Sequence, residues 1–250
     1  GIPRATAIDQ LIMYQMIIKC EKWPLTIFEQ PGPTESFSII VPVNKPWQYD
    51  LNILRSPGLK EINAEIIPIF NATSAADAYQ IGVKKTSHPW KILVHQDVYF
   101  PTGAGMAIGR HFGKLSAQKS TQHPVGFAGM KIDSNGQISK SGLLIDRKNL
   151  FNNGNANHAC SIDEFAVALH EDTNVAIDPN MGWHLWGTEL CLQSKNKSNE
   201  YQAKIIDVPL FHNSINDFIL PEDFLKSLNK LYLKHPNLKS IDTLCGTFSI

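Results

Sequence analysis

The chain has 250 residues, of which 43% are hydrophobic, and its 23 basic and 23 acidic residues give a formal net charge of zero. This length and composition predict one domain with an ordinary hydrophobic core, with or without a short appendage. The balanced charge, and the lack of a run of lysines and arginines, argue against a nucleic-acid partner. No apolar stretch approaches the roughly 20 residues that span a bilayer, so no transmembrane segment is predicted.

Cysteine spacing and the start of the chain bear on where the protein works. The four cysteines are far apart and form no C-x-x-C pair, which argues against a zinc ribbon, a redox dithiol and a disulfide framework. We see no signal peptide at the start of the sequence. Both observations predict reduced thiols in a cytoplasmic protein.

The first 35 residues read as a segment separate from the main domain. Apolar residues at helical spacing predict an amphipathic helix over Ala7–Lys22, and a proline-rich linker follows it. We therefore divide the chain into this N-terminal segment, 1–35, and a main domain, 36–250. The first residue is Gly rather than Met, which leaves open an upstream domain before this segment. Packing of the helix in a homo-oligomer is a second open role.

In the main domain, strands alternate with helices. Phe37–Val43, Glu65–Phe70 and Lys91–Val98 predict strands, and a capping box at Ser74 starts a helix that runs to about Lys85. This alternation predicts an α/β fold with a mostly parallel central sheet flanked by helices.

The rest of the chain adds further elements. Gly103–Gln118 contains G-x-G-x-x-x-G, which differs from the dinucleotide-binding spacing and predicts a helix with small residues. Phe151–His158 is polar and rich in Asn, and predicts a mobile loop. The remaining predictions are strand segments at Val125–Met130, Lys140–Arg147, Ser161–His170 and Ile205–His212, and helices near Thr188 and over Glu222–Tyr232.

The most informative motif ends the third strand, in the segment WKILVHQDVYF. Side chains two residues apart in a strand point the same way, so His95 and Asp97 can approach one small object. Ligands bind at the carboxyl ends of strands in open α/β sheets. The motif therefore predicts a site for a divalent cation or a phosphate-bearing ligand.

An ordered set of segments carries a family resemblance. The set is FSIIVPV, FNATSAADAYQIGVKK, ILVHQDVYFP, VGFAGM, DEFAVALHED, IDPNMGWHLWGTELCL and VPLFHNS. It resembles the bacterial glycosyltransferase-like family that includes the streptomycin-biosynthesis StrF proteins, which is related to family 2 glycosyltransferases with the GT-A fold. The resemblance runs from about Phe37 to about Ser214.

The resemblance implies a GT-A domain that transfers a sugar from a nucleotide-diphosphate sugar, with uridine as the default base, to a glycan or small-molecule acceptor. The transfer is expected to invert the anomeric centre. His95-Gln96-Asp97 stands where this fold carries a D-x-D motif, which holds Mn²⁺ or Mg²⁺ on the donor diphosphate. Asp97 matches the last carboxylate of that motif.

The same resemblance implies roles for other residues. His212 falls at the place of a third metal ligand or diphosphate contact, and Glu189 at the place of the general base. The donor is expected to contact Pro42, Val43, Asn71, His95, Gln96 and Asp97. The acceptor or sugar is expected to contact Asp163, Glu164, Trp183, His184 and Trp186.

Other interpretations stay open. Glu189 suits the first turn of any helix, and the two tryptophans are more often core residues than sugar platforms. A non-catalytic domain that binds a sugar nucleotide or a glycan is one rival function. A metal-dependent hydrolase built from His95, Asp97, His184 and His212 is another, although these residues lack the compact spacing of known hydrolase motifs.

Overall fold

The computed structural model describes residues 6–22, 27, 32–147, 149–215 and 220–249. Much of the predicted proline-rich linker lies outside the described residues. The helices are α1 (Ala7–Lys22), α2 (Pro46–Leu51), α3 (Pro57–Lys60), α4 (Ala75–Val83), α5 (Ala104–Ala117), α6 (Trp186–Ser198) and α7 (Glu222–Lys234).

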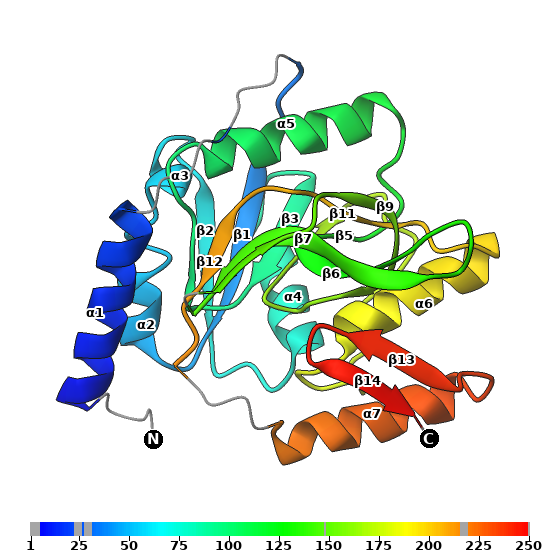
Figure 1. The fold of residues 1–250 in the computed structure, drawn as a ribbon. Coiled ribbons are helices and arrows are strands. Elements are labelled where there is room, and N and C mark those ends of the chain that lie inside the picture. The colour runs from blue at the N-terminus through cyan, green and yellow to red at the C-terminus, as the bar shows by residue number, and fades with distance from the viewer. Residues whose placement is uncertain (1–5, 23–26, 28–31, 148, 216–219, 250) are drawn as a thin grey trace.

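The strands fall into one large sheet and one hairpin (Figure 1). The sheet has the order β2-β1-β3-β10-β5-β11-β9-β6-β7-β12-β4, with β8 beside β7. Its strands are β1 (Phe37–Val43), β2 (Glu65–Phe70), β3 (Trp90–Val94), β4 (Val98–Tyr99), β5 (Val125–Gly126), β6 (Ala128–Ile132), β7 (Ile138–Asp146), β8 (Asn149–Asn152), β9 (Ala156–Ile162), β10 (Ala166–His170), β11 (Ala203–Ile205) and β12 (Leu210–His212). The hairpin is β13 (Ser240–Thr243) with β14 (Gly246–Ser249).

The α/β architecture agrees with the prediction, but the sheet is mixed rather than mostly parallel. β1 pairs in parallel with β2 and β3, as the βαβ alternation predicts. β10 then joins β3 antiparallel, and β6, β7 and β9 also pair antiparallel with one another. Short turns return the chain directly between β6 and β7 and between β7 and β8, so these pairs are antiparallel, whereas β10 meets β3 and β9 meets β6 from distant parts of the chain.

Two predicted segments differ in detail. The strand predicted over Lys91–Val98 ends at Val94, and β4 begins only after a turn at 95–97. The predicted loop Phe151–His158 contains β8 and the start of β9, because the backbone of the polar stretch still finds partners in the sheet. The Ser74 cap is confirmed, since its hydroxyl accepts a hydrogen bond from the Asp77 N–H at 3.1 Å.

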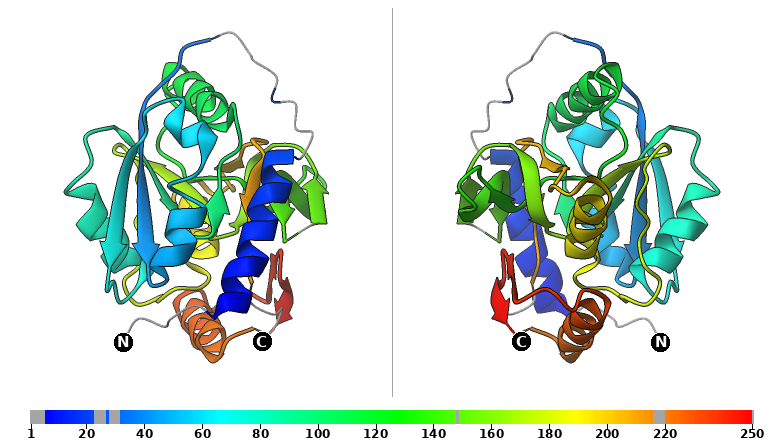
Figure 2. Two further views of the ribbon diagram at one scale, coloured as in Figure 1. Left: turned by 90° about the vertical axis from the view of Figure 1, so that its left-hand side faces the viewer. Right: turned by 90° about the vertical axis from the view of Figure 1, so that its right-hand side faces the viewer.

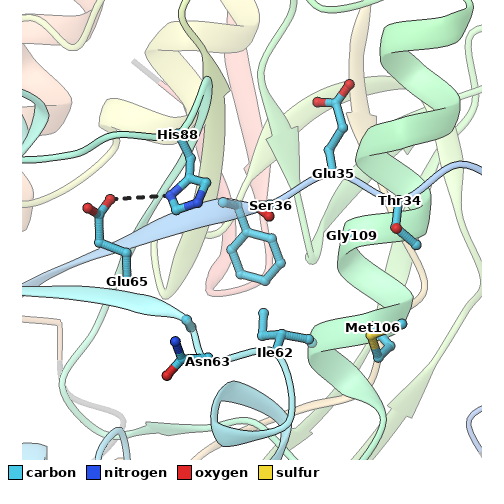
Figure 3. A pocket seen from close by; sticks show the side chains of 12 residues that line it. Thr34, Glu35, Ser36, Ile62, Asn63, Glu65, His88, Met106 and Gly109 are labelled. Carbon is cyan, nitrogen blue, oxygen red and sulfur yellow. Dashed lines mark hydrogen bonds and ion pairs between the residues drawn. The ribbon is translucent and has the colours of Figure 1, made fainter.

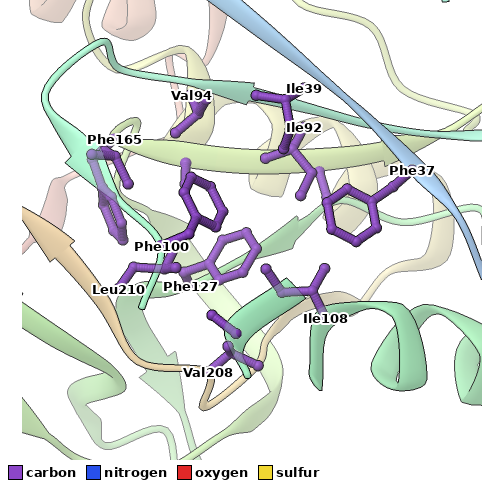
Figure 4. Packing of buried hydrophobic residues seen from close by; sticks show 14 of the residues in the cluster. Phe37, Ile39, Ile92, Val94, Phe100, Ile108, Phe127, Phe165, Val208 and Leu210 are labelled. Atoms are coloured by element: carbon purple, nitrogen blue, oxygen red, sulfur yellow. The ribbon is translucent and has the colours of Figure 1, made fainter. Parts of the chain in front are cut away.

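Alternating side chains of the central strands fill two cores. On one face, Phe37 and Ile92 pack with Ile108 and Phe112 of α5 (Figure 4). On the other face, Ile40 and its neighbours pack with residues of α4, α6 and α7. Helices thus cover both faces of the sheet, which fixes the strand ends in space.

The glycines of α5 let this helix approach the backbone of other segments. A Cβ atom on Gly105 would lie 2.0 Å from the Gly58 carbonyl oxygen, and one on Gly113 would lie 2.2 Å from that of Pro33. The G-x-G-x-x-x-G pattern therefore serves close packing of α5, in line with the predicted helix of small residues.

The N-terminal helix packs on the main domain. Ile17 and Cys20 of α1 are buried against Tyr99, Ile145 and Phe211, so the helix covers the sheet edge formed by β12 and β4 (Figure 2). None of the described helices is long and apolar enough to cross a membrane.

A polar network ties the amino-terminal ends of the first strands together. Glu65 accepts hydrogen bonds from the Ser38 hydroxyl and from the Ser87 N–H and hydroxyl, and it lies 3.4 Å from His88 Nδ1 (Figure 3). Burial alone would raise the pKa of Glu65, but these hydrogen bonds outweigh it and lower the pKa to about 2. A cavity of about 240 Å³ lies beside this network, at the end of the strands away from the HQD motif.

We predict that Glu65→Gln lowers the melting temperature at pH 7. A carboxylate with a lowered pKa stabilises the folded state above its unfolded pKa, near 4.5, and loses that effect as the pH falls toward 2. The difference in melting temperature between wild type and variant should therefore shrink from pH 6 to pH 3. Thermal melts across this range test it, with the exposed Glu222→Gln as control. A difference that stays constant with pH would contradict the prediction.

Candidate active site

Three side chains meet at the carboxyl-terminal ends of β3 and β12. His95 and Asp97 lie in the turn after β3, and His212 is the last residue of β12. One ligand atom from each lies within 4.8 Å of the others. The structure thus brings together the three residues that the sequence nominated as metal ligands, although His212 lies more than a hundred residues after the other two.

A turn, rather than strand alternation, holds His95 and Asp97 side by side. The Val98 N–H donates to the His95 carbonyl at 3.2 Å, which closes the turn. The His95 N–H donates to the Phe165 carbonyl at 2.8 Å, and the Asn213 N–H donates to the Asp97 carbonyl at 2.9 Å. These bonds fasten the turn to β10 and to the chain after β12, so the motif is held from both sides.

Asp146 orients the His212 ring. His212 pairs with Asp146 in the parallel register of β12 and β7, and its Nδ1 lies 3.1 Å from Asp146 Oδ1. Its Nε2 then faces Asp97 Oδ1 at 3.6 Å, which is longer than a hydrogen bond. A carboxylate behind a histidine is the usual way in which a metal-binding ring is held in place.

The charges around the cluster perturb both rings. Burial would lower the pKa of His212, but the charge of Asp97 and the close contact with Asp146 raise it to about 9. Desolvation lowers the pKa of His95, and the charge of His212 lowers it further. The charges of Asp97 and Asp163 raise it. The same carboxylates that raise the pKa of His212 also attract a cation to the cluster.

The donor set fits a divalent cation. Two imidazole nitrogens and one carboxylate oxygen converge, and the carboxylate behind His212 supplies the outer support. Imidazole and carboxylate together suit Mn²⁺ or Zn²⁺ better than Mg²⁺, which prefers oxygen ligands. Three protein ligands leave coordination positions for a substrate.

Residues predicted to contact the donor lie at the same edge of the sheet. Pro42 and Val43 end β1, and Asn71 follows β2 with a positive φ of 59°. The Gln96 carboxamide oxygen accepts hydrogen bonds from the Asn44 and Lys45 N–H groups at 3.0 and 2.8 Å. Gln96 therefore fastens the loop after β1 to the HQD turn. The contacts of these residues with a donor stay a prediction.

The acid pair Asp163–Glu164 stands beside the cluster, in the turn between β9 and β10. The charge of Asp163 acts on both His95 and His212. Burial, and then the negative charge of Asp163, raise the pKa of Glu164 to about 8, although Glu164 accepts a hydrogen bond from the Gly187 N–H at 3.2 Å. A carboxyl with a raised pKa beside a second carboxyl is typical of acid–base sites.

The aromatic candidates take different positions. Trp186 is only 2% exposed and belongs to the core, so it offers no face to a sugar. Trp183 is half-buried and packs against the same core cluster. The His184 ring is half-buried, with its centroid 5.9 Å from that of Phe224, and its charge also acts on His95.

Glu189, the predicted general base, occupies a structural position. Its side chain has no exposed surface, and its Oε1 lies 2.6 Å from Lys234 Nζ and 3.5 Å from His235 Nε2. Gln193 also donates a hydrogen bond to its carboxylate. Glu189 therefore ties α6 to α7, and a substrate hydroxyl cannot reach it in this conformation.

Asp146 is the site residue that the sequence analysis missed. Its signal was present, because the apolar run LLID ends in an acidic residue just as ILVHQD does. What the sequence lacked was the pairing of β7 with β12, which brings Asp146 to His212.

Comparison with solved structures defines the fold. The chain matches the crystal structure of GalNAc-T7 with UDP, GalNAc and Mn²⁺, with a TM-score of 0.55 and 9% identity, over 93% of this chain and 57% of that one. It also matches the mannosyltransferase PcManGT from Pyrobaculum calidifontis in complex with GDP-Man and Mn²⁺, with a TM-score of 0.45 and 12% identity, over 90% of this chain and 77% of that one. The chain thus spans little more than half of GalNAc-T7.

No protein-family model and no curated protein sequence matches the chain. The structure has the GT-A fold of nucleotide-sugar glycosyltransferases, as the sequence predicted.

We predict that Glu189→Gln lowers stability by roughly 3 kcal/mol, because it removes the fully buried carboxylate that ties Lys234 of α7 to α6, although Lys234 keeps Asp178 as a second partner. Chemical denaturation measures the loss. The exposed pair of Glu222 and Lys226 offers a matched control, and Glu222→Gln should cost under about 0.5 kcal/mol. If Glu189→Gln instead keeps wild-type stability but loses turnover, Glu189 acts as the general base.

Proposed function

We propose that this chain is a glycosyltransferase that moves a sugar from a nucleotide-diphosphate sugar to an acceptor hydroxyl. The observation that carries the proposal is the cluster of His95, Asp97 and His212 at the carboxyl ends of the strands of a GT-A fold. Ligands of open α/β sheets bind at this edge.

His95, Asp97 and His212 would hold the divalent cation, and Asp146 would keep His212 in its metal-binding orientation. A bound cation of this kind supplies Lewis-acid stabilisation of the departing diphosphate. The neighbouring GalNAc-T7 structure contains UDP and Mn²⁺, which makes uridine and manganese the first choices to test. The donor's nucleoside would lie over Pro42, Val43 and Asn71, beside the loop that Gln96 holds.

Asp163 and Glu164 supply the general base in this proposal, in place of Glu189. Asp163 acts electrostatically on both His95 and His212, so it lies close to the metal-ligand cluster. Removal of the acceptor proton by a carboxylate, with direct displacement at the anomeric carbon, inverts the configuration of that carbon. The likeness to StrF-type and family 2 enzymes supports the same single-displacement course.

We predict that a nucleoside diphosphate, UDP first, raises the melting temperature in the presence of Mn²⁺ and that Asp97→Ala abolishes the shift. A ligand that binds only the folded state stabilises it by mass action. Thermal melts with a panel of nucleoside diphosphates, with and without Mn²⁺, measure this. Asp172→Ala removes an exposed carboxylate outside the cluster and should keep the full shift.

The outcomes separate the rival functions. A nucleotide shift that needs no metal would keep the transferase and remove the cation from the proposal. Stabilisation by Mn²⁺ alone, without any nucleotide effect, would favour a metal-dependent hydrolase. Binding of nucleotide sugars without turnover across acceptors would favour the non-catalytic binding domain.

We predict that Asp163→Asn lowers the rate of nucleoside diphosphate release from the donor sugar by about 10²-fold or more, the contribution of a general base. It should leave the Mn²⁺-dependent thermal shift in place. Glu164→Gln, which keeps the hydrogen bond from Gly187, should have a smaller effect. A steady-state assay of nucleoside diphosphate release measures both variants, with Asp172→Asn as control. Full activity of Asp163→Asn would remove this residue from the role.

A further inference from the structure

The C-terminal hairpin is anchored firmly to the body of the protein. Ile241 of β13 is buried in the core cluster that also holds residues of α6 and β9. The Phe248 ring of β14 lies 4.9 Å from the Phe224 ring of α7, and the Tyr232 hydroxyl donates to the Phe248 carbonyl at 2.7 Å. The turn at the end of this hairpin therefore has a defined place.

The turn itself is tight and internally bonded. The Cys245 N–H donates to the Thr243 hydroxyl oxygen at 3.1 Å, and that hydroxyl donates to the Gly246 carbonyl at 3.1 Å. The Thr247 hydroxyl adds a bond to Asp242 at 2.6 Å. Gly246 has a φ of +140°, a conformation that other residues rarely adopt. Leu244 and Cys245 thus project from a rigid tip.

The hairpin lies against β9 and β6, and β9 ends directly before the acid pair (Figure 1). Leu244 packs against the core cluster that contains Val98 and Phe165, the residues that directly follow Asp97 and Glu164. Phe165 in turn stacks on His212, with ring centroids 5.6 Å apart. Cys245 is exposed, whereas Cys20, Cys160 and Cys191 are buried. The thiol therefore stands at the surface beside the candidate site.

The titration of Cys245 agrees with this placement. Desolvation, and then the charges of Asp163, Glu164 and Asp146, raise the pKa of the Cys245 thiol to about 11. Asp163 and Asp146 also act on His212 of the metal-ligand cluster. A thiol held neutral by its neighbours is a small, weakly polar surface rather than a nucleophile.

We propose that Leu244 and Cys245 form one wall of the acceptor site, so that the size of the side chain at position 245 decides which acceptors can reach the reaction. This inference rests on the proposed function. The acceptor hydroxyl must bind beside the acid that takes its proton, and the hairpin turn is the surface element next to that acid pair. The donor, by contrast, binds on the opposite side of the cluster, over the ends of β1 and β2.

The test compares two acceptors of different size in the same protein. Water reacts with the donor in any open site, whereas glycerol and free monosaccharides need the acceptor space. Cys245→Trp should lower the ratio of transfer to hydrolysis at least about tenfold, because a displaced acceptor loses its alignment. The donor would be a nucleotide sugar of the base found in the thermal panel, and the two products would be separated by chromatography.

Two variants control for size and for loss of the thiol. Cys245→Ser keeps the volume of the side chain and should keep the wild-type ratio. Ser240→Trp places the same bulk at the exposed far end of the hairpin and should also keep it. The thermal shift with Mn²⁺ and nucleoside diphosphate should stay within error in all three variants.

The outcomes are distinct. If the wild-type protein shows no thermal shift with any nucleoside diphosphate, the proposed function fails and this inference falls with it. If the shift is present but the ratio of transfer to hydrolysis is the same in wild type and Cys245→Trp, including no transfer in either, only the acceptor wall is refuted.

Discussion

The placement of one short strand, β12, determines the candidate site. Its three residues pair in parallel with β7, and the last two pair antiparallel with β4, so the side chain of His212 lies between Asp146 and Asp97. Two carboxylates on either side of one imidazole raise its pKa, and Asp146 fixes the direction of its Nε2. Neither carboxylate would meet His212 in an isolated strand. The long-range pairing is therefore the constraint on which a metal site here depends.

How much of this could be predicted from the sequence differs between local and non-local features. The Ser74 cap, the apolar runs of β1 and β3 and the small face of α5 follow from short-range rules, and the structure agrees with them. The HQD turn was predicted as the end of a strand, because period-2 patterning does not reveal where a ladder stops. The mixed sheet depends on partners that lie far apart in the chain, and such pairings leave no local pattern to read.

The two acidic candidates for proton transfer show why residue type and position alone were insufficient. Glu189 stands in the first helical turn, as the family resemblance requires, but the fold brings Lys234 to its carboxylate and closes it off from the surface. Asp163 and Glu164 were expected to contact the acceptor or sugar, and the fold brings them beside His95 and beside the start of α6. Glu189 and the acid pair differ in the side chains that lie against each carboxylate, and only tertiary contacts determine those neighbours.

The parallel and antiparallel halves of the sheet meet at the turn 95–97, which interrupts the chain between β3 and β4. The parallel strands β1, β2 and β3 end at an open edge, which suits the long nucleotide part of a donor. The antiparallel half returns the chain in short turns, and one of these turns presents the acid pair. Because the His95 N–H bonds to Phe165 and the Asp97 carbonyl accepts from Asn213, the interrupted strand is fastened to both halves at once. A continuous β3 would carry His95 and Asp97 past this junction, so the turn that strand periodicity did not predict is the feature that joins the proposed donor side to the proposed acceptor side.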